Sequence, residues 1–173
     1  MSESLVLREA TTADIPTLVT LVRAAFEDYR GRLDPPSGAH NETPETFRQA
    51  LQTGFAALGL VNDAAAGCVF YSQEDEHMYL GRLSVLRPFR RYGVGQALME
   101  YVEQRTRALG LPRVQLGVRT ALPHLQAYYE RLGYHVVRYE AHAGYTVPTY
   151  VVMEKQLGRE GASSIRHNTF DSP

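Results

Sequence analysis

The sequence predicts an α/β protein, of the α+β kind with a mixed sheet that carries helices on its faces. Three observations support this fold class. Apolar residues recur at every second position in some segments and at every third or fourth position in others. The predicted elements follow the order β-α-α-β-β-β-α-β-α-β-β, so strands and helices are interleaved along one chain. Glycine and proline residues punctuate the segments and give most elements a clear start or end.

The chain begins with a predicted strand that leads into a helix. Residues 4–10, SLVLREA, alternate apolar and polar side chains as a half-buried strand does. Thr11 and Asp14 then form a capping signal ahead of apolar residues spaced three or four apart over 15–26. This spacing predicts the first helix.

A long connection and a second helix follow. Residues 29–42 are rich in turn-forming types, and Thr43 followed by Pro44 resembles the start of a helix that runs through about Leu51. Long loops in compact domains are often functional, although an irregular connection explains this one equally well.

Three strands are predicted in the middle of the chain. The apolar segments 54–63 and 65–72 form a hairpin that turns at Asn62 and Asp63. The segment 77–86 is the third strand.

The remaining elements alternate again. Apolar residues at helical spacing from Val94 to Leu109 predict a long helix that Gly110 ends. Further along, the sequence predicts a strand over 112–120, a short helix from Pro123 to the C′ residue Gly133, and two antiparallel strands over 134–141 and 148–157.

Length and composition limit the classes of protein to consider. A chain of 173 residues corresponds to about one domain, which we expect to span residues 1–157 and to be followed by a polar tail, 158–173, of a composition typical of disorder. A net charge of −1 provides no general attraction to nucleic acid or to an anionic membrane. The single cysteine, Cys68, excludes an internal disulfide, and the histidines lack close metal-ligand spacing, so no metal is expected. With no apolar leader segment near the start, we expect a cytoplasmic protein.

One motif stands between a predicted strand and the long helix. In RPFRRYGVGQ, Arg90-x-x-Gly93-x-Gly95 places glycines where a backbone must approach a ligand closely and where the first N–H groups of a helix are free. Such a helix start attracts phosphate, and Arg90 and Arg91 add positive charge. The alternative is a plain tight turn with solvated arginines.

Two common nucleotide-binding motifs do not match. A P-loop requires G-x-x-x-x-G-K-[ST], which the chain lacks. The dinucleotide fingerprint requires a third glycine where Leu98 stands, and an acidic residue about 20 positions further on, where the segment RVQLGVRT has none. A nucleotide-binding oxidoreductase would therefore depend on the glycines alone.

The segment LSVLRPFRRYGVGQALM, together with YYERLGY and the final PTYVVMEKQL, resembles the GCN5-related N-acetyltransferase (GNAT) superfamily over roughly residues 5–157. The resemblance implies a mixed, mostly antiparallel sheet with about four helices, and acetyl-CoA as the acyl donor. It places the donor-binding residues at Leu83, Ser84, Val85, Arg90, Arg91, Gly93, Val94, Gly95 and Gln96. Many members carry an asparagine shortly before the tyrosine of the second segment, and here Leu122, Pro123 and His124 stand in that region.

The resemblance also implies catalytic roles. Tyr129, four residues before Gly133, corresponds to the tyrosine that donates to the leaving thiolate, and a backbone N–H near Val85 suits a developing oxyanion. The alternative for Tyr129 is a buried core aromatic, because it is in phase with Leu125 and Leu132. Glu76, in the acidic run before the central strand, is a candidate for the base that accepts the proton of the amine, although such a run is usually a solvated turn. Tyr79 and Arg82 are alternatives that could face the acceptor.

The expected activity is transfer of an acetyl group to a primary amine of a small molecule or peptide, directly within a ternary complex. The alternative is a module of the same fold that binds acyl-CoA without turnover. Acidic residues 74–76 would suit a cationic acceptor, whereas Arg30, Arg32 and Arg82 would suit one that carries a carboxylate. A homodimer through the last strands is plausible for the family.

Overall fold

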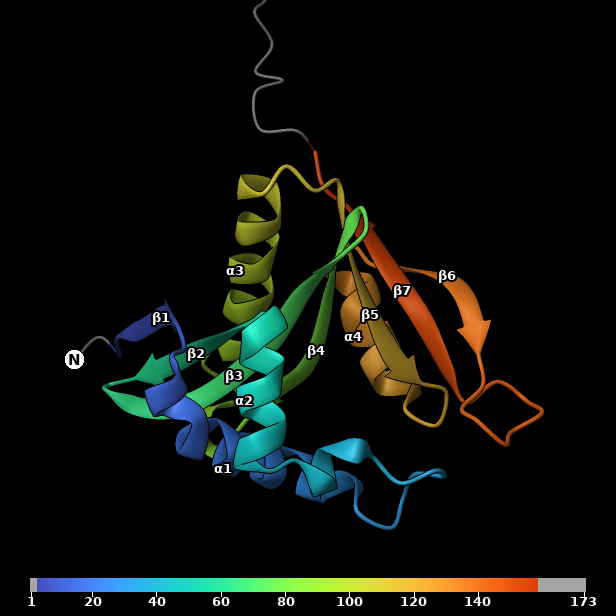
Figure 1. The fold of residues 1–173 in the computed structure, drawn as a ribbon, viewed down its shortest axis with the longest axis horizontal. Coiled ribbons are helices and arrows are strands. Elements are labelled where there is room, and N and C mark those ends of the chain that lie inside the picture. The colour runs from blue at the N-terminus through green and yellow to red at the C-terminus, as the bar shows by residue number, and fades with distance from the viewer. Residues whose placement is uncertain (1–2, 159–173) are drawn as a thin grey trace, which may run out of the picture.

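A computed structural model describes residues 3–158 and contains seven strands and four α-helices (Figure 1). The strands are β1 (Leu5–Glu9), β2 (Phe55–Val61), β3 (Ala64–Glu74), β4 (His77–Val85), β5 (Arg113–Arg119), β6 (His135–Glu140) and β7 (Tyr150–Gln156). The helices are α1 (Ile15–Phe26), α2 (Pro44–Thr53), α3 (Val94–Ala108) and α4 (Pro123–Arg131). All eleven predicted elements are confirmed in type and order, whereas the predicted tail lies almost wholly outside the described residues.

All seven strands form one mixed sheet in the order β1-β2-β3-β4-β5-β7-β6. Only the β4–β5 pair is parallel, so the expected mixed, mostly antiparallel sheet is confirmed. The turn at Asn62 and Asp63 places both residues at positive φ, which the tight hairpin between β2 and β3 requires. The last two strands are antiparallel as predicted, and β7 inserts between β5 and β6.

The helices cover opposite faces of this sheet. Alternate residues of β2 separate between the two faces: Ala56 and Leu58 belong to a buried cluster with α1 and α2 side chains, whereas Ala57 belongs to a cluster with α3 and α4 side chains. Leu98 of α3 and Tyr129 of α4 lie in the second cluster. None of the helices within residues 3–158 combines the length and apolar character that a membrane span needs.

The parallel strands β4 and β5 pair over a short stretch only. Their register joins Met78 to Val114, Tyr79 to Gln115 and Leu80 to Leu116, and no pair follows. In Figure 1 the two strands lie side by side near the β3–β4 turn and separate towards the opposite end of the sheet. The sheet therefore has a V-shaped opening in its middle, which we call the β4–β5 opening.

A β-bulge in β4 lies where this opening begins. On the β3 side, Phe70 pairs with Gly81 and Cys68 pairs with Ser84, so Arg82 and Leu83 together oppose Val69. Arg82 adopts φ of 53°, which is unusual for a residue with a side chain. Such a bulge bends its strand, so it explains why β4 leaves β5 after Leu80.

The start of α1 is fixed by the predicted capping residues. The Asp14 carboxylate accepts a hydrogen bond from the Thr11 N–H at 2.8 Å and binds the Arg8 guanidinium through both oxygens, each at 2.8 Å. The hydrogen bonds from Arg8 lower the pKa of Asp14 to about 2. The ionised carboxylate therefore joins β1 to the turn that begins the helix.

Asp14→Asn should lower the free energy of unfolding by about 1 kcal/mol at pH 7, because a charge-assisted cap and its ion pair are lost. Since the folded pKa lies below the ordinary aspartate value, this contribution is fully present above about pH 4 and disappears as the pH falls through about 2. Urea unfolding of both proteins across this range measures the difference. A difference that stays constant down to pH 2 would contradict the assignment.

Candidate active site

The edge of β4 that faces the opening offers free backbone groups. The Leu86 N–H donates to the Ala66 carbonyl, on the β3 side, at 2.9 Å. Successive N–H groups along a strand point to opposite sides, so the residues one and three positions before Leu86 direct their N–H groups away from β3. Leu83 and Val85 are those residues, and within residues 3–158 no strand pairs with them on the β5 side. Ser84 is only 2% exposed and its hydroxyl donates to the Arg82 carbonyl at 2.9 Å, which fixes the strand between them.

The start of α3 is a second source of free N–H groups. Gly93 precedes the helix with φ of 70°, a left-handed conformation that glycine adopts at little cost, and the space above its Cα is open. Among the described residues no side chain caps this helix start. The side chain of Val94 lies close above Gly59 and Gly67, which holds the helix start close to the sheet. An uncapped, well-held helix start is suited to an anionic ligand.

Two of the arginines before α3 are held by one acid. Asp28, just after α1, accepts a hydrogen bond from Arg87 Nε at 2.9 Å on one oxygen, and its other oxygen lies 2.8 Å from Arg90 Nη2. These hydrogen bonds lower the pKa of Asp28. Arg90 Nε also donates to the Val85 carbonyl at 3.1 Å, so its guanidinium is fixed between the end of β4 and the residue just after α1.

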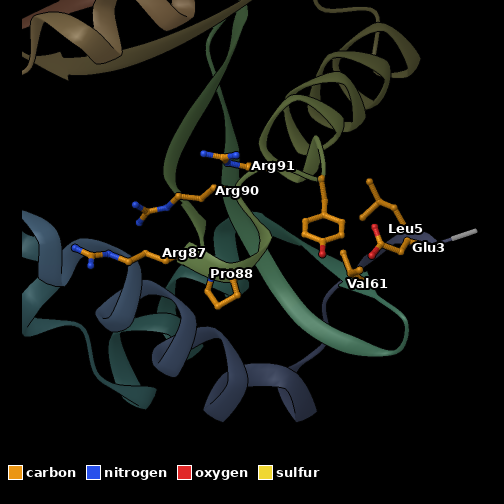
Figure 2. A pocket seen from close by; sticks show the side chains of 8 residues that line it. Glu3, Leu5, Val61, Arg87, Pro88, Arg90 and Arg91 are labelled. Atoms are coloured by element: carbon orange, nitrogen blue, oxygen red, sulfur yellow. The ribbon is translucent and has the colours of Figure 1, made fainter.

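Figure 2 shows how these side chains lie around the loop. Arg87, Arg90 and Arg91 extend to the same side, away from Glu3, Leu5 and Val61. A cavity of about 850 Å³ borders the loop, lined by Glu3, Leu5, Val61, Arg87, Pro88, Arg90, Arg91 and Tyr92. No residue of β4, β5 or α4 lines it, so this cavity is separate from the β4–β5 opening.

The two neighbouring tyrosines of α4 have different surroundings. Tyr129 is only 8% exposed, belongs to the α3–α4 cluster, and contacts the Tyr134 ring edge-on at a centroid distance of 6.1 Å. Tyr128 is half-buried, and its hydroxyl lies 3.2 Å from the position that a Cβ on Gly95 would take. A side chain at position 95 would therefore crowd the Tyr128 hydroxyl, which glycine avoids.

Burial raises the pKa of Tyr129, and the neighbouring Tyr128 and Tyr29 raise it further. The phenol therefore stays protonated throughout the neutral range and can donate a hydrogen bond. Tyr29 follows Asp28 directly, at the start of the α1–α2 connection. Burial raises the pKa of Tyr29 as well, while the positive charge of Arg90 opposes that rise.

The opposite side of the opening is enclosed by two loops. The Tyr145 hydroxyl donates to Asp34, and Arg119 at the end of β5 donates to the Pro35 carbonyl. The first contact joins the α1–α2 connection to the β6–β7 connection, and the second joins it to the end of β5. Beneath them, the Tyr79 hydroxyl lies 3.2 Å from the position that a Cβ on Gly117 would take, so β5 carries glycine there.

Glu76 does not lie with the other predicted site residues. It is at the β3–β4 turn with its side chain 82% exposed, and its nearest positive partner is Arg113 at 3.9 Å. This turn is at the closed end of the β4–β5 opening, opposite to the start of α3 (Figure 1). The position argues against the predicted role of Glu76 as the base.

The arginines that we considered for a carboxylate-bearing acceptor have partners of their own. Arg82 binds Glu42 at 2.8–2.9 Å and Arg30 binds Glu27 at 2.7 Å. Within residues 3–158 no three histidine, cysteine or acidic side chains are grouped to hold a metal ion. Cys68 is buried, and burial raises the pKa of its thiol to about 12, which makes it unreactive as a nucleophile.

Three residues that contribute to this region were not predicted from the sequence: Asp28, Tyr29 and Glu42. All lie in or beside the long α1–α2 connection. The two acids bind arginines that are distant in the sequence: Asp28 binds Arg87, 59 residues away, and Glu42 binds Arg82, 40 residues away. No local pattern could have indicated these pairs. The only signal was the length of the loop itself.

Comparison with known proteins agrees with the geometry. The model of the acetyltransferase (GNAT) family matches residues 18–134. Similar structures include the ribosomal-protein-S18-alanine N-acetyltransferase from Escherichia coli, which is 18% identical with a TM-score of 0.74 over 93% of this chain and 99% of that chain.

Two structures from Thermoplasma species are similar as well. The PaiA N-acetyltransferase from Thermoplasma acidophilum in complex with coenzyme A is 17% identical, with a TM-score of 0.75 over 89% of this chain and 99% of that chain. Ard1 from Thermoplasma volcanium is 18% identical, with a TM-score of 0.73 over 90% and 99%. At these identities the structures establish the shared fold. The family match covers most of the chain, and this protein belongs to the GNAT acetyltransferase family.

Proposed function

We propose that the protein is an acetyl-CoA-dependent N-acetyltransferase that acts on a primary amine of a small molecule or peptide. The observation that carries this proposal is the meeting of a free strand edge, at Leu83 and Val85, with the uncapped start of α3 at Gly93. One offers N–H donors in a row, and the other offers a positive helix end beside three arginines. An elongated ligand with an anionic end matches both.

The residues around the opening suit acetyl-CoA. The N–H groups of α3 at Val94, Gly95 and Gln96 would hold its diphosphate, with Arg90 and Arg91 nearby. Leu83 and Val85 would hold the extended arm in the manner of an added strand. Bound there, acetyl-CoA would supply an activated thioester.

In the proposed reaction the acetyl group passes directly from sulfur to the nitrogen of the amine. A neutral amine forms a bond to the acetyl carbon, the bond from that carbon to sulfur breaks, and the thiolate leaves. The N–H of Val85 would donate to the developing oxyanion; the bond of the next residue, Leu86, to the β3 side supports this, because the N–H of Val85 then faces the opposite way. The proton of the amine leaves to water or to a base on the enclosed acceptor side.

Tyr129 is our proposed donor to the leaving thiolate. Its raised pKa, due first to burial, keeps the phenol protonated, while the thiol that forms has an ordinary pKa of about 8.5. The phenol therefore stabilises the thiolate by donating a hydrogen bond more readily than by releasing its proton.

The second candidate function for this fold is a module that binds acyl-CoA without turnover. The Asp34–Tyr145 and Arg119–Pro35 contacts favour turnover, because they hold the α1–α2 connection in place beyond the proposed donor site, where a pure acyl-CoA binder needs no further structure. The relatives named as N-acetyltransferases, one of them for an alanine of ribosomal protein S18, support an amine as the acceptor.

Acetyl-CoA and CoA should both raise the melting temperature, because each binds the folded state, whereas NADH should not. At about 100 times the dissociation constant the added stability is about 2.7 kcal/mol. Thiol release from acetyl-CoA in the presence of an amine panel then separates an enzyme from a module. Stabilisation without thiol release for any amine would favour the module, and no stabilisation would contradict the donor site.

Tyr129→Phe should lower kcat by roughly 10- to 100-fold with little change in acetyl-CoA affinity, since it removes one donor to the leaving group. Tyr128→Phe is the matched control: its hydroxyl lies beside Gly95, at the proposed diphosphate site, so its loss should affect acetyl-CoA affinity and leave kcat within about threefold. In the wild-type protein, kcat should show no decline between pH 7 and about 10, since the pKa of Tyr129 lies above its ordinary value. Equal loss in the two variants would overturn the assignment.

Glu76→Gln should leave kcat/KM within about twofold of the wild-type value, because the side chain is solvated and lies at the closed end of the opening. The slope of the acid limb of the pH–rate profile should also be unchanged. A loss above about 30-fold with a changed acid limb would restore Glu76 as the base.

A further inference from the structure

The bulge in β4 carries a conformational cost that the chain has to offset. Arg82 adopts φ of 53°, a left-handed conformation that residues with a Cβ rarely adopt. Glycine would take this conformation without the same cost, and yet the chain has arginine here. The arginine side chain must therefore contribute contacts that glycine lacks.

Those contacts come from Glu42, which lies just before α2. Arg82 Nε donates to Glu42 Oε1 at 2.9 Å, and Arg82 Nη2 lies 2.8 Å from the same oxygen. The carboxylate is mostly shielded from solvent, with 15% of the Glu42 side chain exposed. A partly buried, charge-assisted pair is stronger than an exposed one.

Glu42 is itself held in place from two directions. Its second oxygen accepts a hydrogen bond from the Thr46 hydroxyl at 2.6 Å, and its carbonyl accepts two from Arg23 of α1, at 3.0 and 2.6 Å. Arg82 Nη2 also lies 3.0 Å from where a Cβ on Gly38 would be, so the guanidinium fills that space. The position of Arg82 is thus determined by α1, α2 and the connection between them.

We infer that Glu42 is a positioning residue for the acyl donor: by holding the Arg82 side chain it fixes the bulge of β4 and thereby the direction in which the Leu83 and Val85 N–H groups face. This inference rests on the proposed function. Glu42 touches neither of the proposed donor-binding elements directly, and it acts through Arg82 alone. Its removal should therefore weaken the contacts to the thioester arm and leave those to the diphosphate unchanged.

The test compares four variants with the wild-type protein by calorimetric titration. Acetyl-CoA probes the whole donor site, and 3′-phosphoadenosine 5′-diphosphate, the part of CoA without the arm, probes the α3 start alone. The variants are Glu42→Ala, Arg82→Ala, Arg82→Gly and the double variant Glu42→Ala with Arg82→Gly. Glu45→Gln is the control, because this exposed glutamate of α2 binds, among the residues that the structure describes, only the neighbouring Arg48 and Gln49.

Glu42→Ala and Arg82→Ala should each weaken acetyl-CoA binding roughly tenfold, because the left-handed conformation is no longer held. Arg82→Gly should weaken it only about twofold, because glycine keeps the conformation without the ion pair. In the Arg82→Gly background, Glu42→Ala should have no further effect. Affinity for the nucleotide fragment should stay within about twofold in every variant, which general destabilisation would not produce.

Three results would overturn the inference: unchanged acetyl-CoA affinity in Glu42→Ala, an equal loss for the nucleotide fragment, or a further loss on adding Glu42→Ala to Arg82→Gly. Failure of the wild-type protein to bind acetyl-CoA would instead reject the proposed function. Melting temperatures without ligand identify any variant that does not fold. If Glu42→Ala or Arg82→Ala is such a variant, the comparison of Arg82→Gly with the double variant decides the outcome.

Discussion

The separation of β4 from β5 after Leu80 is the constraint on which the rest of the structure depends. A parallel pair that continued to the end of both strands would satisfy the backbone of Leu83 and Val85 and leave no opening. The bulge at Arg82 ends the pairing after three residue pairs and leaves the N–H groups of one strand edge unpaired. An unpaired edge inside a sheet is unfavourable without a partner, which is why it indicates a ligand site.

The α1–α2 connection holds this edge at both ends. Glu42 holds the bulge through Arg82, and Asp28 holds Arg90, which donates to the Val85 carbonyl at the other end. The same connection supplies Asp34 and Pro35 to the acceptor side. One segment therefore contacts the elements proposed for the acyl donor and those proposed for the amine, so the two sites share a structural support.

Sequence reasoning was accurate where the determinants are local. Periodicity, the capping residues at Thr11 and Asp14, and the glycines at 93 and 133 determine elements from neighbouring residues, and their bounds were close to those in the structure. The motif before α3 could be interpreted because a helix start needs no distant partner to attract an anion.

Other features depend on tertiary contacts that no local pattern reports. Asp28 and Glu42 act through arginines 59 and 40 residues away, and the insertion of β7 between β5 and β6 is a property of the whole sheet. Glu76 is a different case. Its acidic neighbours fitted both a base and a solvated turn, and the β3–β4 turn has its side chain in solvent, where acidic residues are common.

Hydrogen exchange at the amides of Leu83 and Val85, measured by NMR with and without acetyl-CoA, tests the central claim most directly. If the free edge of β4 binds the acyl donor, exchange at both amides should slow by at least about tenfold on saturation, while the Ser84 amide, which faces β3, should change little. Saturable binding of acetyl-CoA with unchanged exchange at Leu83 and Val85 would contradict the account, because the ligand would then occupy some other part of the molecule.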